Sequence, residues 1–105
     1  MTKKELKEWV EYQQSQNNYV PMFVRGGGSG WIEPSDNTEE IFGEDYFEEV
    51  VTLEERLSDE EERDWVKSRF TFVGEELVDM KVLCLRHNTG WNQENFDIYL
   101  CVWDD

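Results

Sequence analysis

The chain has 105 residues, and 25 Asp and Glu against 10 Lys and Arg give it a formal net charge of −15. This length is close to the commonest size of a single domain, and five Trp, six Phe and four Tyr can supply a hydrophobic core, which excludes disorder throughout the chain. The negative charge disfavours direct binding to nucleic acid and to anionic membrane surfaces, because both would repel the chain.

The first predicted element is a helix over about residues 3–16. Thr2 and Glu5 have the spacing of a capping box, in which the threonine is the N-cap and the glutamate is N3. Leu6 and Val10 follow at helical spacing, so one face of this helix is expected to be buried.

A β-hairpin is predicted next. Residues 19–24 read as a strand, in which Pro21 favours an edge position, and the glycine-rich residues 26–30 form a turn that leads into a second strand at Trp31. The glycine run fits neither a phosphate-binding loop nor a dinucleotide-binding loop, because the Lys or the later Gly of those motifs is missing. We interpret it as a hairpin tip, and insertion of this tip into a partner remains an alternative.

The central third predicts helices. Asn37 with Glu40, Thr52 with Glu55 and Ser58 with Glu61 each have the capping-box spacing. After the first of these pairs, a helix face is formed by Ile41, Phe42, Tyr46, Phe47, Val50 and Val51. After the last pair, a helix over about residues 59–68 is expected to bury Trp65 and Val66 and to expose its acids.

The last third predicts three strands, at residues 70–73, 77–86 and 96–103, joined at Gly74-Glu75-Glu76 and by a loop over residues 87–95. In the final strand, alternation places two sets of side chains on opposite faces. One set is Phe96, Ile98, Leu100 and Val102, and the other is Asp97, Tyr99, Cys101 and Trp103.

The last two strands are expected to pair as an antiparallel hairpin. The register that we predict places Leu85 opposite Leu100 and Leu83 opposite Val102, which brings Cys84 opposite Cys101.

Together these elements predict an α+β fold. We expect one domain over residues 1–105, with an antiparallel sheet of four or five strands, an N-terminal helix and one or two acidic central helices. Met1-Thr2-Lys3-Lys4 is followed by an amphipathic helix rather than by the apolar stretch of a signal peptide. No run approaches the roughly 20 apolar residues of a membrane span. We therefore predict a cytoplasmic protein with reduced thiols.

The sequence does not favour an enzyme, a metal site or a cofactor. His87 is the only histidine, and no serine or cysteine nucleophile with an orienting acid stands near it, so we interpret it as a polar loop residue. Cys84, His87 and Cys101 lack the fourth ligand and the spacing of a zinc site. The acids do not match a calcium-binding loop, and they occur in solvated doublets rather than in an apolar pocket that would tune one for catalysis.

The acidic residues gather in one part of the chain. Residues 33–64 hold fifteen acidic side chains against Arg56 and Arg63, a net charge of −13, whereas solubility is served by a charge of magnitude about 2–8 with mixed signs. A helix with dense acids can present a row of carboxylates comparable with duplex DNA, which carries one charge per ~1.7 Å. We predict that such a surface binds a basic groove that normally holds nucleic acid.

The predicted partner-binding residues are acids from this segment and two tryptophans in predicted loops. Loop tryptophans are enriched in binding hot spots, although folding back onto the core remains an alternative for both. The residues are Glu39, Glu40, Glu44, Asp45, Glu48, Glu49, Asp59, Glu60, Glu61, Glu62, Asp64, Trp31 and Trp91.

In size, acidity and α+β pattern, the chain resembles the small acidic phage inhibitors that mimic DNA, which include anti-restriction and anti-CRISPR proteins. The string Gly90-Trp91-Asn92-Gln93-Glu94 is also similar to a stretch in an inhibitor of a type II CRISPR effector. The resemblance implies a non-enzymatic inhibitor in the host cytoplasm, whose target is a CRISPR effector, a restriction enzyme or another nuclease.

Two other functions remain open. An immunity protein that neutralises a basic nuclease toxin would also be small and acidic. A regulatory module that binds a basic protein segment would share the charge without mimicking nucleic acid.

Overall fold

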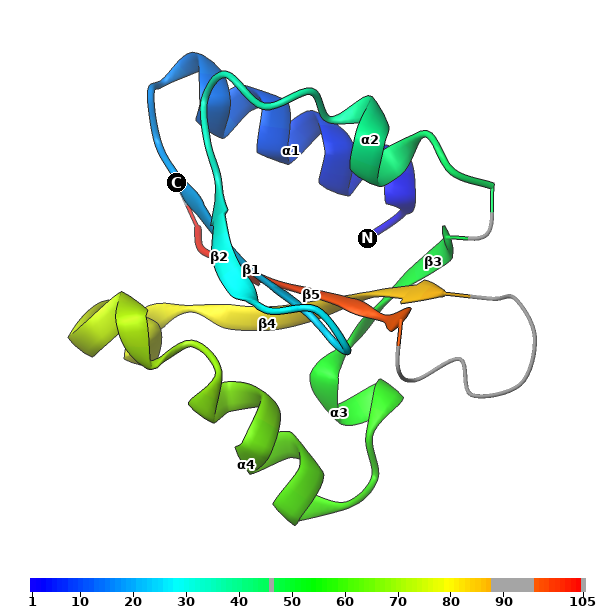
Figure 1. Cartoon of the computed structure of the whole chain (residues 1–105), viewed down its shortest axis with the longest axis vertical. Coiled ribbons are helices and arrows are strands. Elements are labelled where there is room, and N and C mark those ends of the chain that lie inside the picture. The colour runs from blue at the N-terminus through cyan, green and yellow to red at the C-terminus, as the bar shows by residue number, and fades with distance from the viewer. Residues whose placement is uncertain (46, 88–95, 105) are drawn as a thin grey trace.

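A five-stranded antiparallel sheet lies between two layers of helices in the computed structural model (Figure 1). The structure describes residues 1–45, 47–87 and 96–104. The strands are β1 (Val20–Val24), β2 (Ser29–Ile32), β3 (Phe47–Thr52), β4 (Lys81–His87) and β5 (Ile98–Val102), in the sheet order β2-β1-β5-β4-β3. The helices are α1 (Lys3–Ser15), α2 (Glu39–Phe42), α3 (Leu53–Arg56), α4 (Glu60–Ser68) and the 3₁₀ segment η1 (Thr71–Asp79). The predicted α+β class is confirmed.

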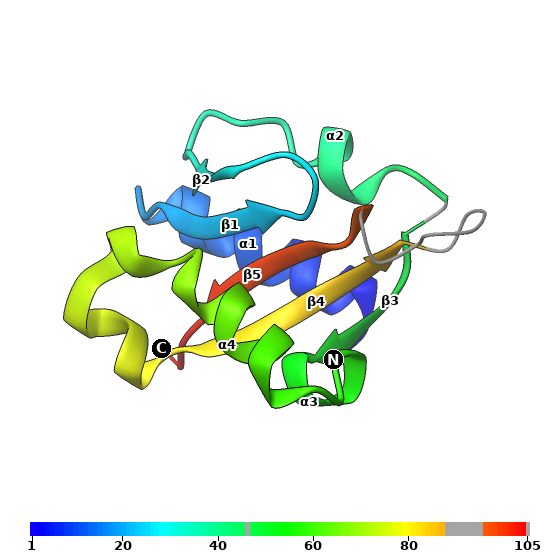
Figure 2. The same ribbon diagram turned by 60° about the horizontal axis from the view of Figure 1, so that its bottom comes forward.

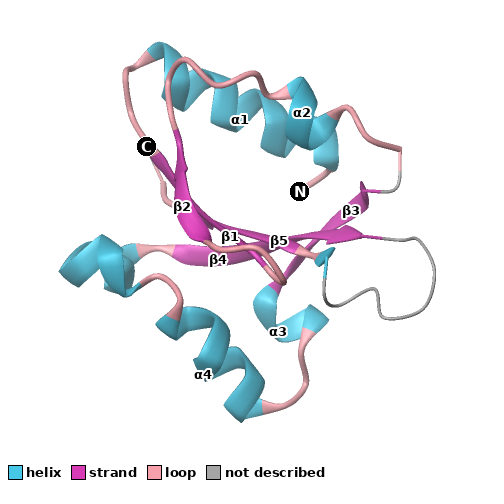
Figure 3. Cartoon of the chain, in the orientation of Figure 1, coloured by secondary structure: helices cyan, strands magenta, loops and turns pink. Residues whose placement is uncertain are grey.

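The sheet buries both of its faces, which Figure 3 shows edge-on. α1 and α2 cover one face and enclose the first core, to which α1 contributes the fully buried Leu6 and Val10. α3, α4 and η1 cover the other face and enclose the second core, in which Leu53 and Val66 are fully buried. Each layer of helices can therefore present its polar side to a different side of the molecule.

Alternation along β5 assigns its side chains to the two cores, as predicted. Ile98 and Leu100 face the first core, whereas Tyr99 and Cys101 face the second. Trp103, which was expected to share the face of Tyr99, follows the end of the strand and packs against the first core instead. The strict alternation of a strand does not extend past its last residue.

The N-terminal helix forms as predicted. The Thr2 side chain accepts a hydrogen bond from the Glu5 backbone N–H at 3.1 Å, and the Glu5 carboxylate accepts one from the Thr2 backbone N–H at 3.2 Å. Asn17, just past the end of α1, adopts a left-handed φ of 61°, a conformation that asparagine tolerates better than most residues.

The predicted hairpin of β1 and β2 is confirmed, but the edge position predicted from Pro21 is wrong. β1 is an inner strand between β2 and β5, and β2 is the edge. The ladder between β1 and β5 begins at Met22, so Pro21 stands one residue before it and pairs only with Trp31 of β2. A proline is tolerated there because the ladder with β5 needs no N–H from it.

The helix predicted across Ile41–Val51 ends early, at Phe42, and the second half of that segment is the edge strand β3. A Cβ at Gly43 would lie 2.5 Å from the Glu39 carbonyl oxygen, so the close approach at this helix end requires glycine. From Phe47 the chain pairs with β4, with a β-bulge between Phe47 and Glu49.

The strand predicted at residues 70–73 is also wrong. These residues lie at the start of η1, in which Gly74 has a left-handed φ of 76° that breaks the helical path. The next strand begins at Lys81 rather than at residue 77. The five-stranded sheet is therefore completed by β3 and not by a strand at residues 70–73.

The predicted antiparallel pairing of the last two strands is confirmed, but the predicted register is wrong by two residues. Leu85 pairs with Ile98 and Leu83 with Leu100, so Cys84 stands opposite Tyr99. A slip of two residues keeps every side chain on the same face, and the apolar pattern cannot distinguish the two registers.

Both cysteines are buried and free. Cys84 and Cys101 occupy diagonal positions across β4 and β5, for which the Cα separation is about 7–8 Å, beyond the roughly 4.4–6.8 Å of a disulfide. Burial raises the pKa of the Cys101 thiol to about 12. Burial, followed by the charge of Asp97, raises the pKa of the Cys84 thiol above its ordinary value.

We expect both thiols to resist alkylation in the folded protein, because burial hinders access and keeps them protonated at mildly alkaline pH. Treatment with iodoacetamide, followed by mass spectrometry of the intact chain, should leave the native mass unchanged. The same treatment in concentrated urea should add two carboxamidomethyl groups. Rapid alkylation of either thiol without denaturant would contradict this burial.

Candidate partner-binding surface

The structure separates the predicted acidic residues into two groups on opposite sides of the sheet (Figure 2). The first, the α2–β3 group, lies on α2 and the turn between α2 and β3 and contains Glu39, Glu40, Glu44 and Asp45. Glu49 of β3 is opposite Arg86, and alternation with Val50 places it on the other face of the sheet. The second, the α3–α4 group, lies on α4 and on α3 with the link between them. It contains the predicted Asp59, Glu60, Glu61, Glu62 and Asp64, and the structure adds Glu54 and Glu55 of α3, which were not predicted. The side chain of Glu48 lies outside the described structure. The single acidic face predicted from the sequence is therefore two surfaces.

Basic side chains compensate part of the α2–β3 group. Glu39 forms an ion pair with Lys7 of α1, and the hydrogen bond between them raises the pKa of that lysine. Glu49 accepts a hydrogen bond from Arg86 Nη1 at 2.8 Å. Lys3 Nζ donates to the backbone oxygen of Glu44 at 2.9 Å. The α2–β3 group therefore has nearby cations in two places, at Lys3 and Lys7, whereas Glu49 and Arg86 pair on the other face of the sheet.

In the α3–α4 group, by contrast, the two arginines of the segment form hydrogen bonds to groups of the protein interior rather than to the neighbouring acids. Arg56 Nε donates to Asp97 Oδ2 at 2.6 Å, and Arg63 Nη1 donates to the backbone oxygen of Leu57 at 2.9 Å. All acids of the group except the half-buried Glu62 are exposed. Within the described parts of the chain, Glu60, Glu61 and Asp64 form no ion pair.

Arg56 and Asp97 form the most buried of the ion pairs between described residues. Asp97 is fully buried, and its second oxygen, Oδ1, accepts a hydrogen bond from the His87 backbone N–H at 3.0 Å. Burial alone would lower the pKa of the Arg56 guanidinium, but the hydrogen bond and charge of Asp97 outweigh it and raise that pKa. The sequence analysis did not predict a role for Asp97, although a lone aspartate directly before an apolar strand is a signal of a buried polar contact.

The interpretation of His87 as a polar loop residue is wrong. It is the last residue of β4 and is buried, with its ring 5.4 Å from that of Phe47 and 5.2 Å from that of Phe96. Through these aromatic contacts and the hydrogen bond from its backbone N–H to Asp97, His87 is part of the packed end of the sheet.

α4 presents its acids to solvent as predicted, but two details differ. Its N-cap is Asp59, whose side chain accepts from the Glu61 N–H at 3.0 Å, and not Ser58. Val66 is fully buried, whereas Trp65 remains 44% exposed and meets the edge of Phe23 at 5.5 Å between ring centroids. Arg25 lies 5.3 Å from the Trp65 ring and reaches Glu62 at 3.8 Å. A half-exposed tryptophan therefore lies on the acidic helix itself.

Two tryptophans, Trp31 and Trp91, were predicted as partner contacts. Trp31 lies on the edge strand β2 and is 42% exposed, with ring contacts to Tyr19 and Phe72. Trp91 lies outside the described residues.

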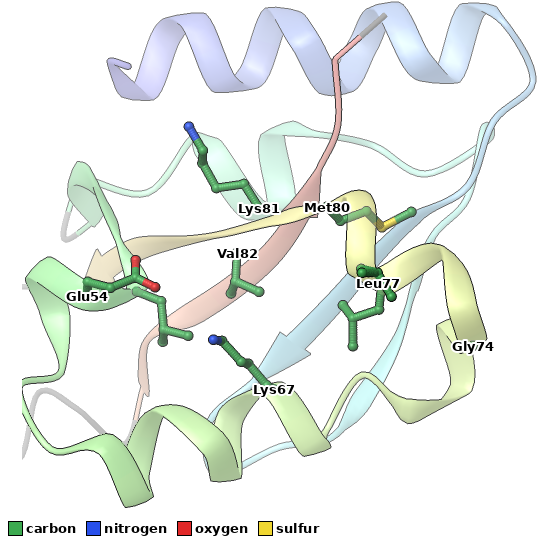
Figure 4. A pocket seen from close by; sticks show the side chains of 9 residues that line it. Glu54, Lys67, Gly74, Leu77, Met80, Lys81 and Val82 are labelled. Carbon is green, nitrogen blue, oxygen red and sulfur yellow. The ribbon is translucent and has the colours of Figure 1, made fainter.

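A pocket of about 630 Å³ separates α4 from η1 (Figure 4). Its lining is mostly apolar and includes Leu77, Met80 and Val82. Lys67 extends toward Val82 from α4, whereas Lys81 extends from the opposite side of β4. No nucleophile with a neighbouring base lines this pocket in the described structure, and its lining does not indicate a reaction.

No group of three or more His, Cys, Asp and Glu among the described residues is arranged to hold a metal ion. No described helix has both the length and the apolar character needed to cross a membrane. Comparisons with protein-family models, with curated proteins and with solved structures found no match for the chain.

The cap of α4 provides a test of how this surface is built. We expect Asp59→Ala to lower the free energy of unfolding by about 0.5–2 kcal/mol, because it removes the acceptor for the Glu61 N–H. The neighbouring Ser58→Ala should change it by less than about 0.5 kcal/mol. Urea denaturation followed by circular dichroism measures both values. Equal losses in the two variants would contradict the assignment of Asp59 as the cap.

Proposed function

We propose that the chain is a non-enzymatic inhibitor that binds the basic nucleic-acid-binding surface of a host defence nuclease, such as a CRISPR effector or a restriction enzyme, in the host cytoplasm. The observation that carries this proposal is the α3–α4 group, in which six exposed acids face solvent while Arg56 and Arg63 bond to the protein interior. The contact surface is therefore more negative than the composition of its segment indicates.

The density of this charge supports mimicry of nucleic acid. Five of the six residues from the N-cap Asp59 to Asp64 are acidic, and six residues at the helical rise of roughly 1.5 Å each extend about 9 Å. One carboxylate per roughly 1.8 Å of helix axis is close to the ~1.7 Å per charge of duplex DNA. A groove that neutralises DNA phosphates with lysines and arginines meets a comparable row of charges on α4.

We assign the main contact to the α3–α4 group rather than to the α2–β3 group. The acids of the α2–β3 group have cations from Lys3 and Lys7 beside them, which weakens their field at a partner. Trp65 supports the choice, because tryptophan is enriched in binding hot spots and this one is 44% exposed on the same helix. Electrostatic steering predicts fast association that slows steeply as salt is added.

The experiment compares two variants with the same change of charge and composition. E60Q/E61Q/D64N neutralises the α3–α4 group, and E40Q/E44Q/D45N neutralises three exposed acids of the α2–β3 group. The immobilised chain should capture from a bacterial lysate, at low ionic strength, a protein that duplex DNA displaces. The α3–α4 variant should lower the association rate of that protein by about tenfold or more, the scale that steering supplies, and the matched control should change it less than about threefold.

Three outcomes would contradict the proposal. They are the failure of the wild-type chain to capture any protein that DNA displaces, equal losses in both variants, and turnover of a substrate by the purified chain. A captured nuclease toxin encoded beside this chain would instead identify an immunity protein.

A further inference from the structure

A second pocket, of about 610 Å³, lies away from the α3–α4 group, and no residue of that group lines it. Its walls come from four segments: the start of β1, the edge strand β2, the end of η1 and the residues that follow β5. Figure 1 shows these segments meeting on the side of the molecule where the C-terminus lies.

Three aromatic rings form walls of this pocket: Tyr19, Trp31 and Trp103. Tyr19 is 49% exposed and meets the Trp31 ring edge-on at 6.3 Å, and Phe72 holds Trp31 from another direction at 5.1 Å. Trp103 is held by Trp9 at 4.8 Å. Because each tryptophan packs against a neighbouring ring, the two indole rings are preorganised for a ligand.

Three carboxylates line the same pocket: Glu76 and Asp79 of η1, and Asp104 after β5. All three are exposed. No lysine or arginine is among the described residues that line the pocket, and none of these carboxylates forms an ion pair in the described structure. The pocket therefore combines aromatic walls with negative charge that the chain itself leaves uncompensated.

We propose that this pocket binds an arginine side chain presented by a basic segment of another polypeptide. Aromatic faces attract cations, and carboxylates beside them supply acceptors for the guanidinium N–H groups. A guanidinium uses both features, because its plane stacks on a ring while its edge donates in pairs, whereas an ammonium group is a compact charge that does not stack. An anionic occupant would be repelled, and an apolar one would leave the carboxylates without a partner.

This inference goes beyond the proposed function, because it concerns a different part of the surface and holds whether or not the α3–α4 group binds a nuclease. The size of the pocket is in the range of roughly 300–1,000 Å³ that is usual for ligand sites. Trp31, predicted from the sequence as a partner contact, would then act through this pocket.

The probe is an acetylated, amidated pentapeptide with one arginine between glycines, compared with the same peptide carrying citrulline. Citrulline has nearly the shape of arginine and no charge, so it isolates the contribution of the cation. Titration followed by NMR should show the arginine peptide binding about fivefold more tightly, as expected for a cation on an aromatic face with exposed carboxylates beside it. The indole N–H signals of Trp31 and Trp103 should move, and that of Trp65 should not.

Two double variants with the same change of charge test the location. E76Q/D79N should weaken binding of the arginine peptide by about fivefold or more, because it removes two of the three carboxylates. The matched control E40Q/D45N should weaken it less than about twofold, because those exposed acids lie outside the pocket and act only through screened long-range attraction. W31L, checked for folding by its NMR spectrum, should also weaken binding while leaving the net charge unchanged.

Equal affinity for the arginine and citrulline peptides would overturn the proposal. So would equal losses in E76Q/D79N and E40Q/D45N, which would mean that the peptide is attracted only by the overall negative charge. A lysine peptide that binds as tightly as the arginine peptide would overturn the assignment to arginine.

Discussion

The buried contact between Arg56 and Asp97 is the interaction on which the arrangement of this molecule depends. Asp97 stands just before β5, and its two oxygens accept from Arg56 of α3 and from the backbone of His87 at the end of β4. One carboxylate therefore joins a helix to two neighbouring strands. Withdrawing such ions from water costs several kcal/mol for each, so the pair is tolerated only because its hydrogen bonds are well formed.

This contact has a consequence for the surface. Arg56 and Arg63 are the only basic residues in the segment of net charge −13, and both bond to groups of the interior rather than to the acids beside them. The acids of α3 and α4 are left facing solvent, while Leu53, Leu57 and Val66 anchor the segment in the second core. These buried apolar contacts offset the self-repulsion among the acids. They also leave the acids on the surface, where a partner can reach them.

Several local signals in the sequence predicted local structure, although the capping box expected at Ser58 and Glu61 does not form. The capping box of Thr2 and Glu5 and the alternation along β5 were both found as expected, because each depends on residues close together in the chain. Three features could not be derived in this way. The apolar positions from Ile41 to Val51 suit a helix, and only pairing with β4 makes Phe47–Thr52 a strand. The β4–β5 register differs by two residues from an alternative that buries the same faces. The partners Arg56 and Asp97 are 41 residues apart, and nothing local indicates their contact.

A double-mutant cycle on this pair tests the account most directly. Arg56→Met and Asp97→Leu, alone and together, replace the charges by apolar side chains of similar size, and urea denaturation gives the free energy of unfolding of each variant. Each single change should cost about 3–5 kcal/mol, because it leaves one charge buried without the partner it faces, and the double variant should recover a large part of that loss. Losses that simply add, or single changes that cost less than about 1 kcal/mol, would contradict the claim that this pair holds the acidic helices to the sheet.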